Sequence, residues 1–150
     1  MATGGTGEYT GAFKGFFFYQ RVFLRAAMRH RKAYAVFPRG YSKSFLSVLV
    51  QMLRCILYPG AKLFTAAGGK SQSAGILAEK VDELCTLIPA LAREIDNARG
   101  GDSVRSKDYC KIAFKNGSYI DNLTASEKSR GKRRQGGILE ECVSIDKTIL

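Results

Sequence analysis

Two short stretches of the chain carry a Lys-Ser pair of the kind that binds nucleotide phosphates. The first reads FPRGYSKS at residues 37–44, and the second reads FTAAGGKS at residues 64–71. In a phosphate-binding loop, backbone N–H groups and the helix dipole hold the phosphates, the Lys neutralises the β- and γ-oxygens, and the hydroxyl holds Mg²⁺. The second stretch lacks only the first glycine of the standard GxxxxGKS pattern, whereas the first lacks both glycines. The match to this pattern favours the second stretch as the phosphate-binding loop, and the flanking sequence does not distinguish between the two stretches.

A pair of carboxylates near the end of the chain could supply the acidic half of an ATP site. Glu140 and Glu141 follow the apolar residues Ile138 and Leu139. At the end of a buried strand, one carboxylate organises the Mg²⁺ shell and its neighbour polarises the attacking water. An acidic pair in this position is also typical of a solvated strand edge or a helix cap. It gains weight because it follows two phosphate-loop patterns.

The pattern of apolar residues predicts helices and strands that alternate along the chain. Asn116 and Gly117 mark a hairpin, because both residues tolerate positive φ. Strands that alternate with helices of this length form a sheet covered by helices. We therefore expect an α/β fold with a parallel sheet flanked by helices. The predicted helices cover residues 16–32, 45–57, 72–88 and 91–96, and the predicted strands cover residues 33–37, 61–67, 109–114, 118–123 and 138–141.

Composition indicates a folded, basic protein with a polyanionic partner. The 150 residues are 45% hydrophobic and carry a formal net charge of +11. That charge is compatible with nucleic acid, with nucleotide phosphates or with an anionic membrane surface. The four cysteines form no C-x-x-C pair, so we expect reduced thiols rather than a zinc site or a disulfide scaffold. Lys and Arg interrupt every apolar run before ~20 residues, so no transmembrane helix is expected.

The order of these segments resembles the ATPase domain of the large terminase subunits of tailed bacteriophages, the motors that package viral DNA. The resemblance covers most of the chain after residue 15. It is carried by YQR at residues 19–21, RGYSKS at 39–44, YPGAKLF at 58–64, the hairpin, and the Arg-Gly turn at residues 130–131 ahead of residues 138–141. It identifies residues 37–44 with the family's divergent Walker A loop and residues 138–141 with its Walker B strand. Ser42 stands where the family usually has Gly, and Glu140 where Asp is commoner.

The resemblance implies a P-loop NTPase-type sheet that binds ATP and Mg²⁺ and hydrolyses ATP. Glu141 would act as general base, with Lys43 and Arg39 stabilising charge, and Ser44 and Glu140 would hold the metal. The remaining ATP contacts would come from Gln20 at the adenine and from Pro38, Arg39, Gly40, Tyr41, Ser42, Lys43 and Ser44 at the phosphates. A basic cluster is the candidate for DNA contact: Lys128, Arg130, Lys132, Arg133 and Arg134.

The resemblance also implies partners and a domain division. We expect residues 1–15 to form a flexible arm and residues 16–150 to form part of an ATPase domain, incomplete at its C-terminal end. The coupling motif, the last strands and a nuclease domain would lie downstream. The expected partners are double-stranded DNA, a small terminase subunit and further copies in a ring at a capsid portal, with no membrane. The expected location is the host cytoplasm, with transient association with the procapsid.

Two other interpretations remain open from the sequence. One is a helicase-like P-loop ATPase that uses Lys70 and Ser71, and it predicts that the second loop binds nucleotide. The other is a non-enzymatic basic DNA-binding protein, whose turns only resemble phosphate loops and which responds to no nucleotide.

Overall fold

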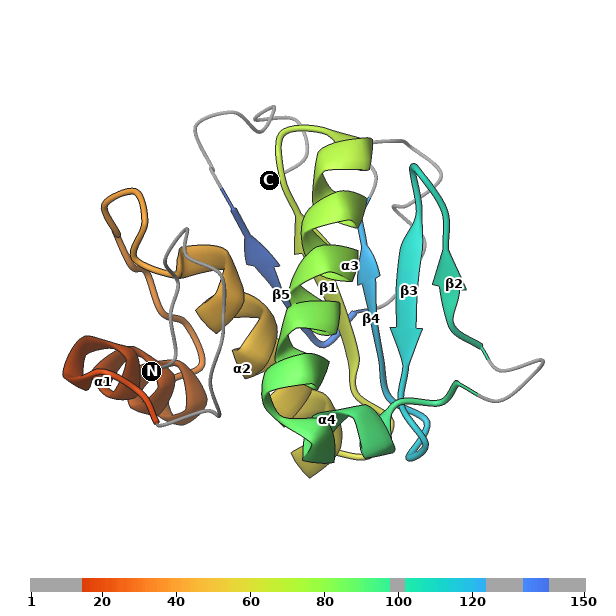
Figure 1. Ribbon diagram of the computed structural model, residues 1–150, viewed down its shortest axis with the longest axis horizontal. Coiled ribbons are helices and arrows are strands. Elements are labelled where there is room, and N and C mark those ends of the chain that lie inside the picture. The colour runs from red at the N-terminus through yellow and green to blue at the C-terminus, as the bar shows by residue number, and fades with distance from the viewer. Residues whose placement is uncertain (1–14, 98–101, 124–133, 141–150) are drawn as a thin grey trace.

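The computed structural model describes residues 15–97, 102–123 and 134–140, which fold into a mixed α/β structure with a five-stranded sheet (Figure 1). The α/β class expected from the sequence is confirmed. The predicted arm lies outside the described residues except for Gly15. In chain order the elements are α1 (Phe18–Arg29), α2 (Lys43–Leu57), β1 (Lys62–Ala66), α3 (Lys70–Leu87), α4 (Pro89–Glu94), β2 (Val104–Arg105), β3 (Cys110–Ala113), β4 (Tyr119–Asn122) and β5 (Gly136–Leu139).

The sheet is mixed, not purely parallel as the sequence predicted. Its strand order is β2-β3-β4-β1-β5, with β1 parallel to both β4 and β5 and with β3 antiparallel to β2 and β4. The reason is the hairpin at Asn116 and Gly117, which the sequence did predict and which reverses the chain between β3 and β4. Gly117 adopts φ +83°, and the Asn116 side chain donates to the carbonyl of Cys55 at 2.7 Å. The hairpin turn therefore also satisfies a carbonyl at the end of α2.

The strand predicted at residues 33–37 is wrong, because this segment forms no regular secondary structure and has no strand partner among the described residues. Tyr34 and Val36 are 89% and 78% exposed, so the apolar run is not buried as its composition suggested. Residues 31–37 and β5 instead line a groove of about 530 Å³. Phe37 packs edge-on against Phe23 of α1, with ring centroids 5.3 Å apart.

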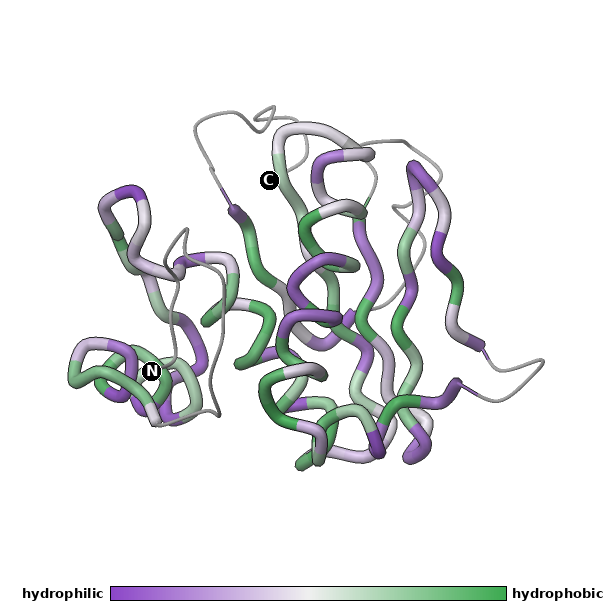
Figure 2. Tube along the Cα trace, in the orientation of Figure 1, coloured by the Kyte–Doolittle hydropathy of each residue, from purple (hydrophilic) through white to green (hydrophobic). Residues whose placement is uncertain are grey.

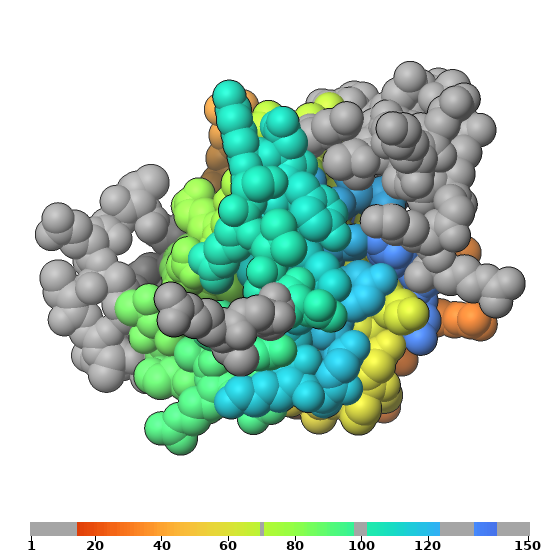
Figure 3. Space-filling view, turned by 90° about the vertical axis from the view of Figure 1, so that its right-hand side faces the viewer, coloured from red at the N-terminus to blue at the C-terminus, as the bar shows by residue number. Residues whose placement is uncertain are grey.

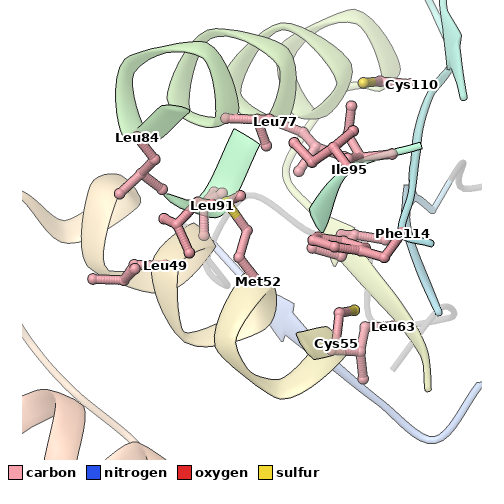
Figure 4. Packing of buried hydrophobic residues seen from close by; sticks show 14 of the residues in the cluster. Leu49, Met52, Cys55, Leu63, Leu77, Leu84, Leu91, Ile95, Cys110 and Phe114 are labelled. Carbon is pink, nitrogen blue, oxygen red and sulfur yellow. The ribbon is translucent and has the colours of Figure 1, made fainter. Parts of the chain in front are cut away.

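The hydrophobic core lies between one face of the sheet and helices α2, α3 and α4 (Figure 4). The alternation of side-chain direction along β3 and β4 places Ile112 and Ile120 on this face. Figure 2 shows hydrophobic and hydrophilic residues following one another along β3. Both isoleucines are fully buried, as are Leu77 and Leu84 of α3. Pro89 stands at the first position of α4, where its missing N–H costs nothing.

Buried polar pairs fix the helices against the strands. The Thr65 hydroxyl on β1 donates to the Gln51 side chain of α2 at 2.8 Å. Asn122 on β4 donates to the Ser73 hydroxyl of α3 at 3.3 Å and accepts from the Cys110 N–H at 2.8 Å. Such pairs specify the register of helix and strand, because a shift would leave buried polar groups without partners.

The outer edge of the sheet is formed by β2, a two-residue strand at the surface on the side seen in Figure 3. The sequence analysis predicted neither a helix nor a strand here. Arg105 of β2 forms a hydrogen-bonded ion pair with Asp82 of α3 at 2.7 Å, which ties this short strand to the helix layer.

The cysteines agree with the expectation of reduced thiols as far as they are described. Cys55, Cys85 and Cys110 are free, and Cys142 lies outside the described residues. Burial raises the pKa of the Cys55 thiol to about 12 and that of Cys110 to about 11, so neither forms a thiolate near neutral pH. None of the described helices is long and apolar enough to cross a bilayer.

The contact between β1 and β5 generates a first prediction. A Cβ built at Gly137 would overlap the ring of Phe64 on the neighbouring strand. We expect Gly137→Ala to lower the free energy of unfolding by about 1–2 kcal/mol, because the ring has to move. In a Phe64→Ala background the same change should be neutral or stabilising, since glycine weakens a strand interior. Urea unfolding of the four proteins measures both effects, and equal losses in the two backgrounds would contradict this account.

Candidate functional site

The loop that precedes α2 has an unusual backbone. Gly40 and Ser42 both adopt left-handed conformations, with φ +81° and +56°, and α2 begins immediately afterwards at Lys43. Left-handed residues in a turn direct successive N–H groups toward one side and form an anion-binding concavity. The first N–H groups of α2 add the positive end of the helix dipole. The loop therefore offers backbone donors to an anion at the start of a 15-residue helix.

The loop borders a hollow of about 310 Å³. Residues 37–45 line most of it, and the rest of the lining comes from Lys80 and Glu83 of α3. Lys43 and Arg39 bring two further cations to the lining. The hollow is therefore a polar, mostly cationic recess at a helix start.

The buried carboxylate of Glu140, far along the chain, contacts the start of α2. The Ser44 hydroxyl donates to Glu140 Oε2 at 2.8 Å, although the two residues are 96 positions apart. Glu140 is only 5% exposed, and its other oxygen, Oε1, has no hydrogen-bond partner among the residues that the structure describes. An unsatisfied buried carboxylate oxygen is costly, so it requires an explanation.

A cation bound between Ser44 and Glu140 would satisfy that oxygen. Mg²⁺ takes oxygen ligands and is usually held by one or two protein groups together with waters and substrate phosphates. A hydroxyl and a carboxylate at the start of a phosphate-binding helix suit this role. No group of three His, Cys, Asp or Glu side chains that could enclose a metal occurs in the described part of the chain. The site thus fits a cation that shares its ligands with a phosphate and does not fit a closed structural metal site.

Helix α1 supports the loop from outside. The rings of Tyr19 and Tyr41 lie 5.3 Å apart, in addition to the contact between Phe23 and Phe37. Gln20 is fully buried, accepts the Phe17 N–H at 2.8 Å and donates to the Ser42 hydroxyl at 3.5 Å. Gln20 does not line the hollow, so the structure gives it a supporting position beside the loop.

The structure brings together most of the predicted phosphate and metal residues. Pro38, Arg39, Gly40, Tyr41, Ser42, Lys43 and Ser44 line the hollow, and Glu140 joins them through Ser44. Glu141 and the basic residues Lys128, Arg130, Lys132 and Arg133 lie outside the described residues.

Arg134 is the member of the basic cluster that the structure describes. Its guanidinium forms hydrogen bonds and an ion pair with Asp121 of β4, and the two side chains are 8% and 2% exposed. It also lies over the ring of Tyr119, 5.4 Å from the centroid. This pair links the residues that precede β5 to β4. The positive charge of Arg134, which was predicted to contact DNA, is therefore paired with the Asp121 carboxylate.

The second Lys-Ser stretch forms a tight connection. β1 ends at Ala66 and α3 begins at Lys70, with Gly69 as the extended N-cap at φ −141°. None of residues 64–71 adopts a left-handed conformation. The connection is therefore too short, and at Gly69 too extended, to wrap around a phosphate as residues 37–42 can. Its residue types are nevertheless closer to the standard pattern.

No family model matches the chain, and no curated protein matches it. The function is therefore inferred from the chain's own residues and geometry.

The sequence analysis missed Lys80 and Glu83. Both fall within the predicted helix at residues 72–88, and their spacing of three marks them as an ion pair on its surface. Nothing in the spacing says which way the helix turns, so the approach of this pair to residues 37–45 is visible only in the folded protein.

The conformation of Ser42 generates a second prediction. A side chain at φ +56° costs about 1–2 kcal/mol, which a glycine avoids, although glycine also loses more entropy on folding. We expect Ser42→Gly to be more stable than Ser42→Ala by about 0.5–1 kcal/mol, since both variants lose the hydroxyl and only one keeps the Cβ. Thermal and urea unfolding of the two variants test this. Equal stability would mean that the left-handed conformation is not maintained in solution.

Proposed function

We propose that the chain binds ATP with Mg²⁺ at the start of α2 and hydrolyses it. The observation that carries the proposal is the hydrogen bond between Ser44 and Glu140, beside a buried carboxylate oxygen that no described residue satisfies. A hydroxyl at a helix start and a carboxylate at the end of an adjacent strand are the two protein ligands that a nucleotide-bound Mg²⁺ requires. The left-handed loop supplies the donors for the phosphates.

Each residue near the loop has a chemical role in this proposal. Lys43 neutralises the β- and γ-phosphate oxygens, and the N–H groups of the loop and of the first turn of α2 bind them. Ser44 and Glu140 hold Mg²⁺, which neutralises charge on the phosphates when it is bound. Arg39 stabilises the charge that develops during transfer, and Glu141 orients the attacking water. Gln20, which is buried against Ser42, keeps the loop in its conformation.

We further propose that this activity belongs to a DNA-packaging motor of the large terminase type. The order of the motifs supports this, as does the charge of the chain: no Asp or Glu occurs between Glu8 and Glu79, and the net charge is +11. A basic chain favours a polyanion such as duplex DNA, bound through its phosphates in a salt-dependent way. In this proposal ATP hydrolysis moves double-stranded DNA into a capsid, with copies of the motor arranged in a ring in the host cytoplasm.

The choice of loop generates a third prediction. We expect calorimetry to detect binding of ATP with Mg²⁺ to the full chain, and Lys43→Ala to weaken it by about 10–100-fold, because a charged hydrogen bond contributes about 1.5–3 kcal/mol. Lys70→Ala is the matched control, with the same change in the second stretch, and should bind like the wild type. Loss of binding in Lys70→Ala alone would indicate the helicase-like interpretation. A folded wild type that binds no nucleotide would indicate the non-enzymatic one.

The buried carboxylate generates a fourth prediction. We expect Glu140→Gln to abolish the dependence of ATP binding on Mg²⁺, since the isosteric amide removes the charge that holds the cation. Without metal, the same variant should unfold with a free energy about 1–3 kcal/mol higher, because the amide carries no buried negative charge. Calorimetry with MgCl₂ and with EDTA measures the first effect and urea unfolding the second. An unchanged requirement for Mg²⁺ would exclude Glu140 as a ligand.

A further inference from the structure

Two charged side chains of α3 face the hollow without belonging to the loop. Lys80 Nζ lies 2.8 Å from Glu83 Oε2 and 3.3 Å from Glu79 Oε1. The side chains of Lys80 and Glu83 are 25% and 33% exposed, while Glu79 is 74% exposed. Lys80 and Glu83 complete the lining of the hollow opposite residues 37–45, and Glu79 does not.

The charges around the hollow are unequal. Among the described residues that line it, Arg39, Lys43 and Lys80 are cationic and Glu83 is the single acidic residue. Burial alone would lower the pKa of Lys80, but the hydrogen bond and charge of Glu83, together with Glu79, raise it above its ordinary value. Lys80 therefore stays protonated at neutral pH, and it lines a hollow whose other residues already favour anions.

Stability does not explain this arrangement. An ion pair between residues three apart on a partly exposed helix contributes only a few tenths of a kcal/mol. A lysine can bury its aliphatic part and direct its charge to solvent, so packing does not require the charge to lie at the hollow. The position of the charge beside a phosphate-binding loop has a direct use, because the ammonium group binds phosphate oxygens well.

We propose that Lys80 is a second phosphate-binding lysine of the site, and that Glu83 is the partner it exchanges for a phosphate oxygen. This rests on the proposed function, since the ligand in the hollow is taken to be a nucleoside triphosphate or another polyphosphate. Before a ligand binds, the Glu83 carboxylate holds the Lys80 ammonium group, and its negative charge repels an anion in the hollow. The exchange links α3 to the loop when the phosphate binds.

Calorimetry on the full chain tests the inference with two probes, ATP and inorganic tripolyphosphate, each with Mg²⁺. Lys80→Met keeps the aliphatic length and removes the charge, and Glu83→Gln removes the carboxylate with little change of shape. Lys115→Ala, a surface lysine in the turn between β3 and β4, is the control for net charge. Melting curves establish that each variant is folded, and Lys80→Gln, which also removes the charge, replaces Lys80→Met should the latter not fold.

We expect Lys80→Met to weaken both probes by about tenfold, which corresponds to 1.4 kcal/mol. Lys80→Arg keeps the charge and should bind within about threefold of the wild type. Glu83→Gln should tighten binding of both probes by about threefold, and this gain should shrink in the Lys80→Met background. Lys115→Ala should bind like the wild type.

Four results would overturn the inference. If the wild type binds and Lys80→Met binds equally well, Lys80 is not a ligand, while the proposed function stands. If Lys80→Met weakens ATP but not tripolyphosphate, Lys80 contacts the nucleoside and not the phosphates. If Glu83→Gln tightens binding equally in both backgrounds, Glu83 acts on the anion directly and no exchange occurs. A wild type that binds neither probe overturns the proposed function and the inference together.

Discussion

The pairing of β5 with β1 is the constraint on which the candidate site depends. This parallel pairing carries the chain to the start of α2, where the Glu140 N–H donates to the Ala66 carbonyl at 2.8 Å and its side chain accepts from Ser44. Gly137 makes the pairing possible, because Phe64 occupies the space of a side chain there. Without β5 the loop would still offer backbone donors, but no described carboxylate would reach the same point.

The conformation of the loop has a second source of support, which is aromatic and lies outside the sheet. Tyr19 and Phe23 pack against Tyr41 and Phe37, and Gln20 reaches the Ser42 hydroxyl. These contacts help to hold a left-handed serine that would otherwise relax. The loop is thus fixed on one side by α1 and on the other by α2, so its donors are oriented before any ligand arrives.

Local patterns predicted most of the elements, and long-range geometry decided the rest. Helices α2 and α3 and the hairpin at Asn116 follow from spacing and turn chemistry, which act within a few residues. Residues 33–37 were predicted as a strand because they are apolar, but a strand needs a neighbour, and a groove lies beside them. The letters also favoured the second Lys-Ser stretch. They do not encode that residues 67–69 form a tight connection without left-handed residues, or that Ser42 adopts the conformation usually reserved for glycine.

The contact between Ser44 and Glu140 also has a consequence for how the protein is made. The hairpin joins strands close in sequence, whereas the hydroxyl and the carboxylate are 96 residues apart. Contacts at such separation form slowly, because a long loop has to close before they contribute any stability. On the ribosome, α2 and the loop are synthesised well before β5. The nascent chain therefore carries the backbone donors for most of its synthesis and gains the carboxylate only when residue 140 has emerged.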